Sequence, residues 1–269
     1  MKPLYIESVS LLLQEVSESS IALKKELEQT CGQKFRRVNH FVLLALVGVF
    51  RLPNVKTIDP MCSLYVGTSN GCSRDTLAML EQMYRDTLLP MPFTFMGLST
   101  NMASFHIAQN LGLSGTNLTL SNLKEPFGEA LSLACMDIEM GKATSALVGC
   151  VDEGAFPLDE FKKATHQLER DMLLEGGCWL KLVSECENPL AVIYARESFT
   201  SIEAVEEYLK KEHLTESRRV MSSGNSSYIG ASEGIAFIQA IQEAHCGVIA
   251  FISRLGVSSF SLTLTRILV

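Results

Sequence analysis

Apolar residues recur along the chain at two spacings, one typical of helices and one typical of strands. Apolar positions three and four residues apart predict helices at residues 21–31, 36–49, 75–87, 101–111, 126–140, 202–213 and 234–244. Short apolar runs bounded by Gly, Asn or Pro predict strands at residues 61–68, 115–121, 146–151, 177–183, 190–198, 248–252 and 260–267. Strands and helices alternate up to residue 154, which predicts parallel strands with helices on both faces of an α/β sheet.

The connections between these elements indicate a single domain. The strands at residues 177–183 and 190–198 are separated by Asn188 and Pro189, which favours a hairpin. No linker rich in Pro, Gly or Ser divides the chain. We therefore expect one domain over residues 1–269.

One long segment carries almost no charge. Residues 88–123 contain no Asp, Glu, Lys or Arg, and His106 is the one ionisable side chain among them. The mean hydropathy of the whole chain is positive, at +0.18. We expect this segment to be buried in the core or under another chain.

Charge and the lengths of the apolar runs exclude several partners. The formal net charge is -7, and no basic cluster is larger than that at residues 34–37, so we expect no nucleic-acid partner. The longest apolar run, at residues 41–50, is too short to span a bilayer. Residues 1–7 do not have the layout of a signal peptide. These features predict a soluble protein of the cytoplasm.

The cysteines favour a reducing compartment. Eight of them are spread through apolar stretches, without the close paired spacings of a disulfide framework or a zinc site. We expect no metal and no cofactor, and most cysteines should be small core residues, Cys135 among them. Cys72, which follows Asn70 and Gly71 at a helix start, is the candidate for a reactive thiol, although a structural cysteine is the commoner case.

Two segments contain a specific order of motifs, PFTFMGLSTNMASFHIAQNLGLSGTNLTLSN and ALSLACMDIEMGKATSALVGCVDEG. An Asn before a buried helix, a turn from Gly112 to Gly115, a strand, a helix and a strand ending in Val-Gly follow one another there. This order resembles the β-ketoacyl synthases of the thiolase-like superfamily. Further matches are Arg36-Arg37, Val66-Gly67-Thr68, Gly71, Glu175-Gly176-Gly177 and residues 230–234. The resemblance implies a layered α-β-α-β-α architecture.

The last part of the chain is shorter than in that family. The resemblance divides the domain into an N-terminal half at residues 1–200 and an abbreviated C-terminal half at residues 201–269. This shortening resembles the chain-length-factor-like subunits of type II polyketide and aryl-polyene-type systems.

The position of the family's nucleophile carries a different residue here. Counted from Gly115, the family's Thr-Ala-Cys falls on residues 122–124, so Lys124 occupies the place of the cysteine. An amine cannot form the thioester that condensation requires. The family's catalytic histidines have no counterpart near residues 226–228, which are Ser, Ser and Tyr. The resemblance thus implies a chain that is not itself an enzyme.

The resemblance also implies a partner and a role. The strand residues Leu118, Thr119, Leu120 and Ser121 would pair with an active ketosynthase in a heterodimer. An acyl carrier protein would bind through that complex. The helix after the first turn would shape the end of the acyl tunnel through Thr76, Met79, Leu80 and Met83, with Phe127 near the blocked site. The alternative is that these five are ordinary core residues at helical spacing.

Two other functions remain open at this point. The chain could be a small stand-alone acyltransferase or thioester hydrolase that uses Cys72 or a serine, or a homodimeric acyl-binding scaffold. The turn at residues 67–71 could cradle a phosphate, but it has no lysine at P-loop spacing, which favours a plain turn. His106 is interpreted as a core histidine, and the charges at residues 206–212 as a solvated helix face.

Overall fold

The structure is a computed structural model that describes residues 2–122, 125–165, 173–221, 232–255 and 259–268. Its helices are α1 (Ile21–Cys31), α2 (His40–Phe50), the short 3-10 helix η1 (Val55–Thr57), α3 (Ser73–Tyr84), α4 (Pro92–Gly97), α5 (Met102–Leu111), α6 (Pro126–Glu139), α7 (Leu158–Ala164), α8 (Ile202–Lys211) and α9 (Ser232–Glu243). Its strands are β1 (Leu4–Glu15), β2 (Ser63–Thr68), β3 (Asn117–Ser121), β4 (Ser145–Asp152), β5 (Leu174–Val183), β6 (Ala191–Phe199), β7 (Arg218–Met221), β8 (Gly247–Leu255) and β9 (Ser259–Ile267). Every helix and strand predicted above overlaps an element of the same type.

The described strands form one nine-stranded sheet in the order β3-β2-β4-β5-β1-β6-β9-β8-β7. β2 pairs in parallel with both β3 and β4, as the alternation of strands and helices predicts. From β4 onward the pairing is antiparallel as far as β8. Parallel pairing thus occurs at both ends of the sheet, in β3-β2-β4 at the end with the motif-rich segments and in β7-β8 at the other.

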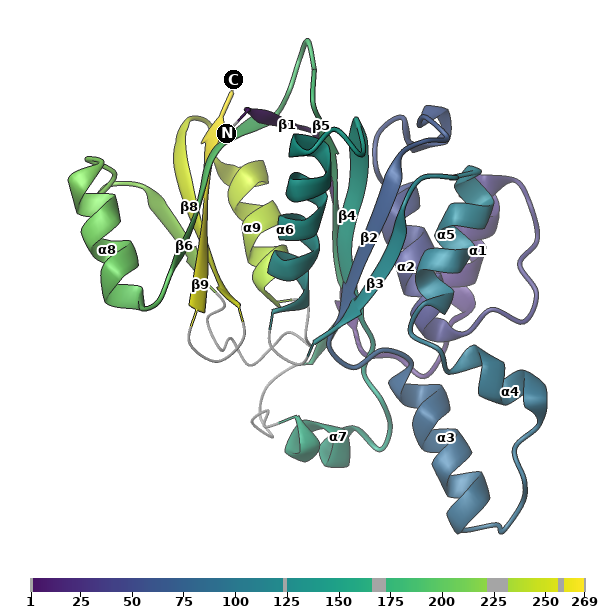
Figure 1. Cartoon of the computed structure of the whole chain (residues 1–269). Helices are drawn as coiled ribbons and strands as arrows, with labels where there is room; N and C mark the ends of the chain where they lie inside the picture. Colours follow the sequence, from purple (N-terminus) through teal and green to yellow (C-terminus); the bar gives the residue numbers. More distant parts are fainter. Residues whose placement is uncertain (1, 123–124, 166–172, 222–231, 256–258, 269) are drawn as a thin grey trace.

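The two central helices lie between two parts of this sheet. Figure 1 shows α6 and α9 with β6, β8 and β9 on one side and β2, β3 and β4 on the other, and one core cluster joins all three layers. Helices α1, α2 and α5 cover the outer face at one end, and α8 covers the outer face at the other. The order of layers is therefore α-β-α-β-α, which confirms the predicted architecture.

Strand β1 has no counterpart among the predicted elements. Its residues alternate between buried and half-buried positions, but Ser8 and Ser10 are buried together with Leu4 and Ile6, which weakens the apolar alternation. β1 lies between β5 and β6 and pairs with both. The hairpin expected between β5 and β6 is therefore wrong, because the strand that separates them comes from the other end of the sequence.

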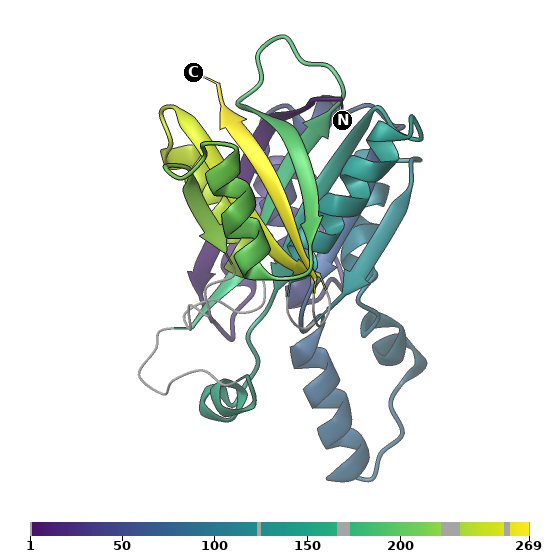
Figure 2. The same cartoon turned by 60° about the vertical axis from the view of Figure 1, so that its left-hand side comes forward.

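Helices α3 and α4 project from the layered body, as Figures 1 and 2 show from two directions. We call α3, α4 and the connecting residues 85–91 the arm. The structure describes all of α3, and no residue of this helix is buried. Leu80 and Met83 are each 38 % exposed, and Thr76 and Met79 are half-buried. The tunnel candidates on α3 are therefore not ordinary core residues.

Trp179 fills the space between two layers. Its ring is fully buried on β5, opposite Gly149 on β4. A Cβ added to Gly48 of α2 would lie only 2.6 Å from the indole Nε1. A Cβ on Gly149 would overlap the six-membered ring of Trp179. Glycine at both positions lets α2 and β4 approach the indole closely.

We predict that Gly149→Ala lowers the free energy of unfolding by about 2–3 kcal/mol, because neither central strand can move away from the added methyl group. The midpoint of urea unfolding, followed by circular dichroism, measures the loss. Gly97→Ala is the matched control, since a Cβ there has no neighbour within 4 Å, and its effect should stay within about 0.5 kcal/mol. Equal losses in the two variants would contradict the packing explanation.

Candidate functional site

The N-termini of the central helices α6 and α9 meet at a buried glutamate. Glu233, the second residue of α9, has an exposed fraction of 0 %. Its Oε1 accepts a 2.8 Å hydrogen bond from the backbone N–H of Gly128 in the first turn of α6, and its Oε2 accepts one of 3.3 Å from Ser253 Oγ on β8. The first N–H groups of a helix have no partner inside the helix and attract negative charge. The carboxyl group of Glu233 thus occupies the anion-binding position at the start of α6.

A second carboxyl group lies close to the first. Burial raises the pKa of Glu233 to about 8, and the negative charge of Glu125 adds to the rise, whereas the N–H groups of Gly128 and Phe127 oppose it. Glu125 directly precedes α6 and is itself buried. Two carboxyl groups in one buried place disfavour double ionisation.

Aromatic side chains close the central layer beside Glu233. The ring of Phe127 lies 6.0 Å from that of Phe237 on α9 and 6.0 Å from that of Phe251 on β8. Gly234 packs against Phe127 so tightly that a Cβ would lie 2.6 Å from the ring. Phe127 belongs to this interior cluster, whereas Thr76, Met79, Leu80 and Met83 lie on the projecting arm. The structure therefore separates Phe127 from the other tunnel candidates.

The nucleophile position inferred from the sequence lies outside the described residues. This applies to Lys124, to the Ser and Tyr side chains at residues 226–228 and to the first two residues of the glycine-rich turn at residues 230–234. The described parts that flank it are Asn122, Glu125 and the start of α6.

The described cysteines of the core are poor nucleophiles. Burial, with help from the charges of Glu153 and Asp75, raises the pKa of the Cys72 thiol to about 12. Burial also raises the pKa of Cys135 to about 12 and that of Cys178 still further. Thiols of this kind are protonated at neutral pH. The burial of Cys72 favours a structural cysteine over the reactive thiol that the acyltransferase alternative requires.

The turn at residues 67–71 closes around a carboxyl group of the protein itself. Asp152, at the end of β4, accepts hydrogen bonds from the backbone N–H groups of Ser69 (3.0 Å) and Asn70 (2.8 Å) and from Thr68 Oγ1 (2.9 Å). Burial raises the pKa of Asp152 to about 7, although these donors oppose the rise. The donors that could cradle a phosphate are already used, which confirms the plain turn.

Arg74 lies at the centre of a polar cluster at the base of the arm. Its Nη2 donates to Glu175 Oε2 at 2.6 Å, and its backbone N–H donates to Glu153 Oε1 at 2.9 Å. Burial raises the pKa of Glu153 to about 8. Burial also acts to raise the pKa of Glu175, but the contacts of His40 and Arg74 outweigh it, and the pKa is lowered.

This cluster contains a serine and a histidine, which bears on the hydrolase alternative. Ser20 Oγ lies 2.7 Å from His40 Nδ1, and His40 Nε2 lies 2.8 Å from Glu175 Oε1. The order resembles a nucleophile, a base and an acid. Because the guanidinium of Arg74 already neutralises Glu175, that carboxylate is a poor partner for a catalytic histidine. The cluster fits a structural role better.

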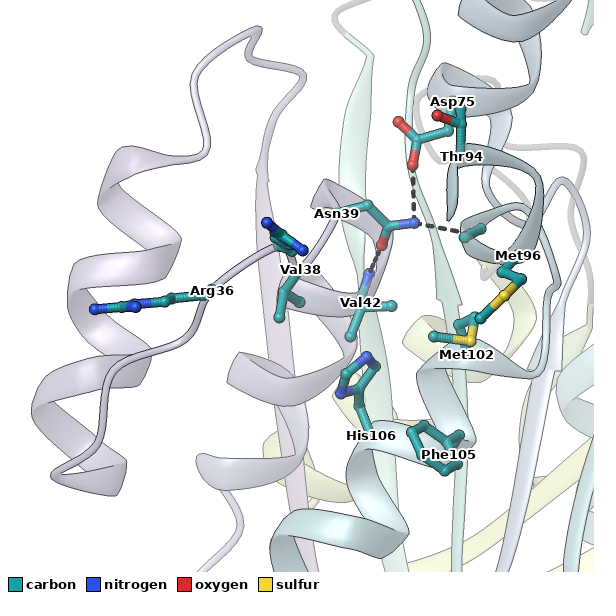
Figure 3. Close-up of a pocket in the computed structure, with 12 residues that line it drawn as sticks. Arg36, Val38, Asn39, Val42, Asp75, Thr94, Met96, Met102, Phe105 and His106 are labelled. Atoms are coloured by element: carbon teal, nitrogen blue, oxygen red, sulfur yellow. Dashed lines mark hydrogen bonds between the residues drawn. The ribbon is translucent and has the colours of Figure 1, made fainter. Parts of the chain in front are cut away.

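A pocket of about 570 Å³ lies between the arm and the helices α2 and α5. Its wall consists of Arg36, Arg37, Val38, Asn39, Val42, Asp75, Thr94, Met96, Gly97, Met102, Phe105 and His106. Figure 3 shows Asn39 directed toward Asp75, the two methionines facing each other, and Arg36 extending away from the other labelled side chains. His106 lines this pocket beside Phe105 and is half-buried, so the interpretation as a core histidine is wrong. Burial lowers its pKa, which favours a neutral ring.

Strand β3 forms one edge of the sheet and is open on its outer side within the described residues. Leu118 is 41 % exposed, and Leu120 and Thr119 are half-buried. The hydroxyl of Thr119 donates to Ser104 Oγ of α5 at 2.9 Å. The four strand residues expected at an interface therefore lie together at a sheet edge.

Solved structures with the same arrangement decide the fold. The ishigamide ketosynthase/chain length factor aligns over 100 % of this chain and 100 % of its own, with a TM-score of 0.74 and 16 % identity. AntDE, the ketosynthase of a type II polyketide synthase, in complex with the acyl carrier protein AntF and bound to the hexaketide, aligns over 99 % of each chain with a TM-score of 0.70 and 13 % identity. This chain has the ketosynthase fold.

A more distant ketosynthase shows how much of the fold is retained. The ketosynthase from module 1 of the bacillaene synthase of Bacillus amyloliquefaciens has a TM-score of 0.61 at 9 % identity, and the match covers 100 % of this chain and 76 % of that one. No protein-family model and no curated protein matches the sequence. The structural likeness confirms the predicted thiolase-like fold, and the activity has to be inferred from the site.

Two further expectations from the sequence concern metal ions and membranes. In the part of the chain that the structure describes, no group of three or more His, Cys, Asp or Glu side chains could hold a metal ion. None of the described helices is long and apolar enough to cross a membrane.

Glu233 and Arg74 are important residues that the sequence analysis did not identify. The available signal for Glu233 was a charged residue inside a small-residue turn that leads into an apolar helix. For Arg74 the signal was weaker, because its partners Glu153 and Glu175 are distant in the sequence. Neither contact follows from local spacing.

We predict that the Glu233→Gln variant loses less stability than the wild type when the pH is raised. The pKa of Glu233 is raised to about 8 in the folded chain. The glutamate therefore stabilises the folded chain fully at a pH below its unfolded pKa, and this stabilisation is lost as the pH rises through its folded pKa. From pH 5 to pH 9 the wild type should lose about 4 kcal/mol more than the variant.

Urea unfolding at several pH values measures this difference. Glu207→Gln, at an exposed position on α8, is the control and should follow the wild-type curve. If the Glu233→Gln and wild-type curves remain parallel, Glu233 does not have the raised pKa.

Proposed function

We propose that the chain is a non-catalytic, chain-length-factor-like partner of an active ketosynthase. The observation that carries the proposal is the carboxyl group of Glu233 at the start of α6. Acyl transfer on a ketosynthase needs a thiolate there and N–H groups that can hold an oxyanion. The N–H of Gly128 is already bonded to Glu233, and the resemblance puts an amine, Lys124, in place of the thiol.

The two edges of the sheet differ in length and charge, and the difference favours β3 as the interface. At one edge β7 has four residues, and Arg218 and Arg219 form ion pairs of 2.8 Å there with Glu243 and Glu206. Short, charged edge strands resist pairing with another chain. At the other edge, β3 has no charged residue. β3 is therefore the edge suited to main-chain pairing with a partner.

The backbone of β3 offers free groups for such pairing. Leu64 N–H donates to the Thr116 carbonyl, and Asn122 N–H donates to the Thr68 carbonyl. In a parallel ladder, alternate residues bond to the same neighbour. The N–H and C=O groups of Thr119 therefore face away from β2, toward the open edge.

Exposed apolar side chains occur on the arm and beside this edge. They are Leu77, Leu80, Met83, Tyr84, Leu88, Leu89, Met91, Phe95, Met96, Phe105 and Leu118. Large exposed apolar patches are typical of surfaces that another chain covers. The uncharged segment at residues 88–123 supplies many of these side chains, which supports its burial under another chain.

The arm supplies the candidates for tunnel-shaping side chains. Thr76, Met79, Leu80 and Met83 follow the spacing i, i+3, i+4 and i+7 and lie on one face of α3. Bulky side chains there would limit the length of an acyl chain that grows in the partner. Phe127 acts separately by filling the central layer.

The proposal also covers the partners, the domain organisation and the location of the pair. The acyl carrier protein binds the complex rather than this chain alone. The whole of residues 1–269 acts as one domain, and the pair works in the cytoplasm. It serves polyketide, polyene or fatty-acid-type chain elongation without a cofactor.

A homodimeric scaffold is the competing candidate, and one observation favours it. The strand Asn117–Ser121 alternates polar and leucine residues, so an antiparallel pairing with a second copy would match Leu with Leu and polar with polar side chains. Co-expression with a cysteine-bearing ketosynthase separates the two, because the heterodimer should replace any homodimer.

We predict that Thr119→Pro abolishes co-purification with that ketosynthase. Proline removes the outward N–H of Thr119 and leaves the bonds to β2 in place, and it is tolerated at sheet edges. Thr119→Val is the matched control, because it keeps the N–H and loses only the hydroxyl, and it should reduce recovery less than about two-fold. Full recovery of the pair with Thr119→Pro would exclude β3 as the interface.

We predict that Met79→Trp shortens the products of the reconstituted pair without abolishing heterodimer formation, because the indole is larger than the thioether. Mass spectrometry of the products and gel filtration of the pair measure the two effects. Glu81→Gln, at an exposed position on the same helix, should leave the products unchanged. Wild-type product lengths with Met79→Trp would remove the tunnel assignment.

A further inference from the structure

The arm gains little orientation from apolar packing. Among the described side chains of α3 and α4, none is buried. Leu89, between the two helices, is 89 % exposed. A helix pair without core contacts can take many directions unless its base is fixed.

Arg74 fixes that base from several sides at once. Its Nη1 donates to the Ser17 carbonyl after β1 at 2.6 Å, its Nε donates to the Gly154 carbonyl after β4 at 2.6 Å, and its Nη2 donates to Glu175 on β5 at 2.6 Å. The guanidinium also lies 5.2 Å from the centre of the Phe156 ring. One side chain on the first turn of α3 thus binds three separate segments of the body.

A second contact holds the other side of the base. Asn39 Nδ2 donates to Asp75 Oδ2 at 2.9 Å and to the Gly97 carbonyl at the end of α4 at 3.2 Å. Asn39 Oδ1 accepts from the N–H of Val42, which fixes the side chain at the start of α2. The beginning of α3 and the end of α4 are therefore linked to the same residue.

We propose that Arg74 is a positioning residue that sets the direction of the arm and so determines where the α3 face with Thr76, Met79, Leu80 and Met83 stands relative to the partner. The part that concerns product length rests on the proposed function. The part that concerns arm direction does not.

The planar guanidinium suits this role because its donors point in fixed, diverging directions. A lysine has the same charge, so Glu175 and Glu153 keep a cation, but it cannot reach three acceptors in different segments. Arg74→Lys therefore removes the fixed geometry and leaves the charge. Its effect should appear in the arm before it appears in the body.

The test measures the direction of the arm in the full chain. Nitroxide labels at Leu89→Cys and at the exposed Cys246 report the distance between arm and body by electron double resonance, with the half-buried Cys31 and Cys186 replaced by serine. With Arg74→Lys the distance distribution should widen about two-fold, while circular dichroism and the unfolding midpoint change little. Arg85→Lys, at the other end of α3, is the control and should match the wild type.

The second readout is the product pattern of the reconstituted pair. Arg74→Lys should leave heterodimer formation intact and broaden the range of product lengths, because the tunnel end is no longer held at one place. An unchanged distance distribution, or a change that Arg85→Lys reproduces, overturns the inference. A wider distribution with unchanged products limits Arg74 to orienting the arm. Failure of any ketosynthase to co-purify with the wild type contradicts the proposed function instead.

Discussion

The burial of α6 and α9 between two parts of one sheet is the constraint on which the rest of the structure depends. Both helices begin inside the protein, where unpaired N–H groups are costly. Glu233 relieves this cost by accepting from Gly128, and it does so with a carboxyl group whose own burial raises its pKa. The same contact uses one of the N–H donors at the start of α6. The stability of the central layer and the proposed absence of acyl-transfer chemistry therefore depend on the same residue.

A second group of buried carboxyl groups organises the place where the arm leaves the body. Asp152, Glu153 and Glu175 follow or begin the central strands β4 and β5, and each accepts backbone N–H groups from neighbouring turns. Arg74 brings the compensating charge from α3. The arm is therefore joined to the body by polar contacts and presents apolar side chains to the outside. Such an arrangement displays a surface for a partner rather than adding to the core of this chain.

Much of the fold could be predicted from the sequence because its main elements have strong local patterns. The apolar helix α2 and the parallel strands β2 and β4 are long enough, and free enough of polar residues, to be identified alone. β1 was not identified, because Ser8 and Ser10 interrupt its apolar face and form part of the buried surface. The predicted hairpin between β5 and β6 was wrong for the same reason, since the strand between them was not recognised. The contact of Glu233 with Gly128 spans 105 positions and that of Arg74 with Glu175 spans 101, so local pattern has no access to them.

The form of the central layer explains why a chain without the chemistry would keep the whole fold. The edge strand β3 is held by β2 and by α5, and α6 packs under both β2 and β4, so the pairing edge keeps its shape only while the central layer is filled. An empty space at the start of α6 would leave a cavity and unpaired N–H groups. Glu233 and the rings of Phe127, Phe237 and Phe251 keep the layer closed. Under the proposed function, a subunit that contributes shape retains its core for this reason.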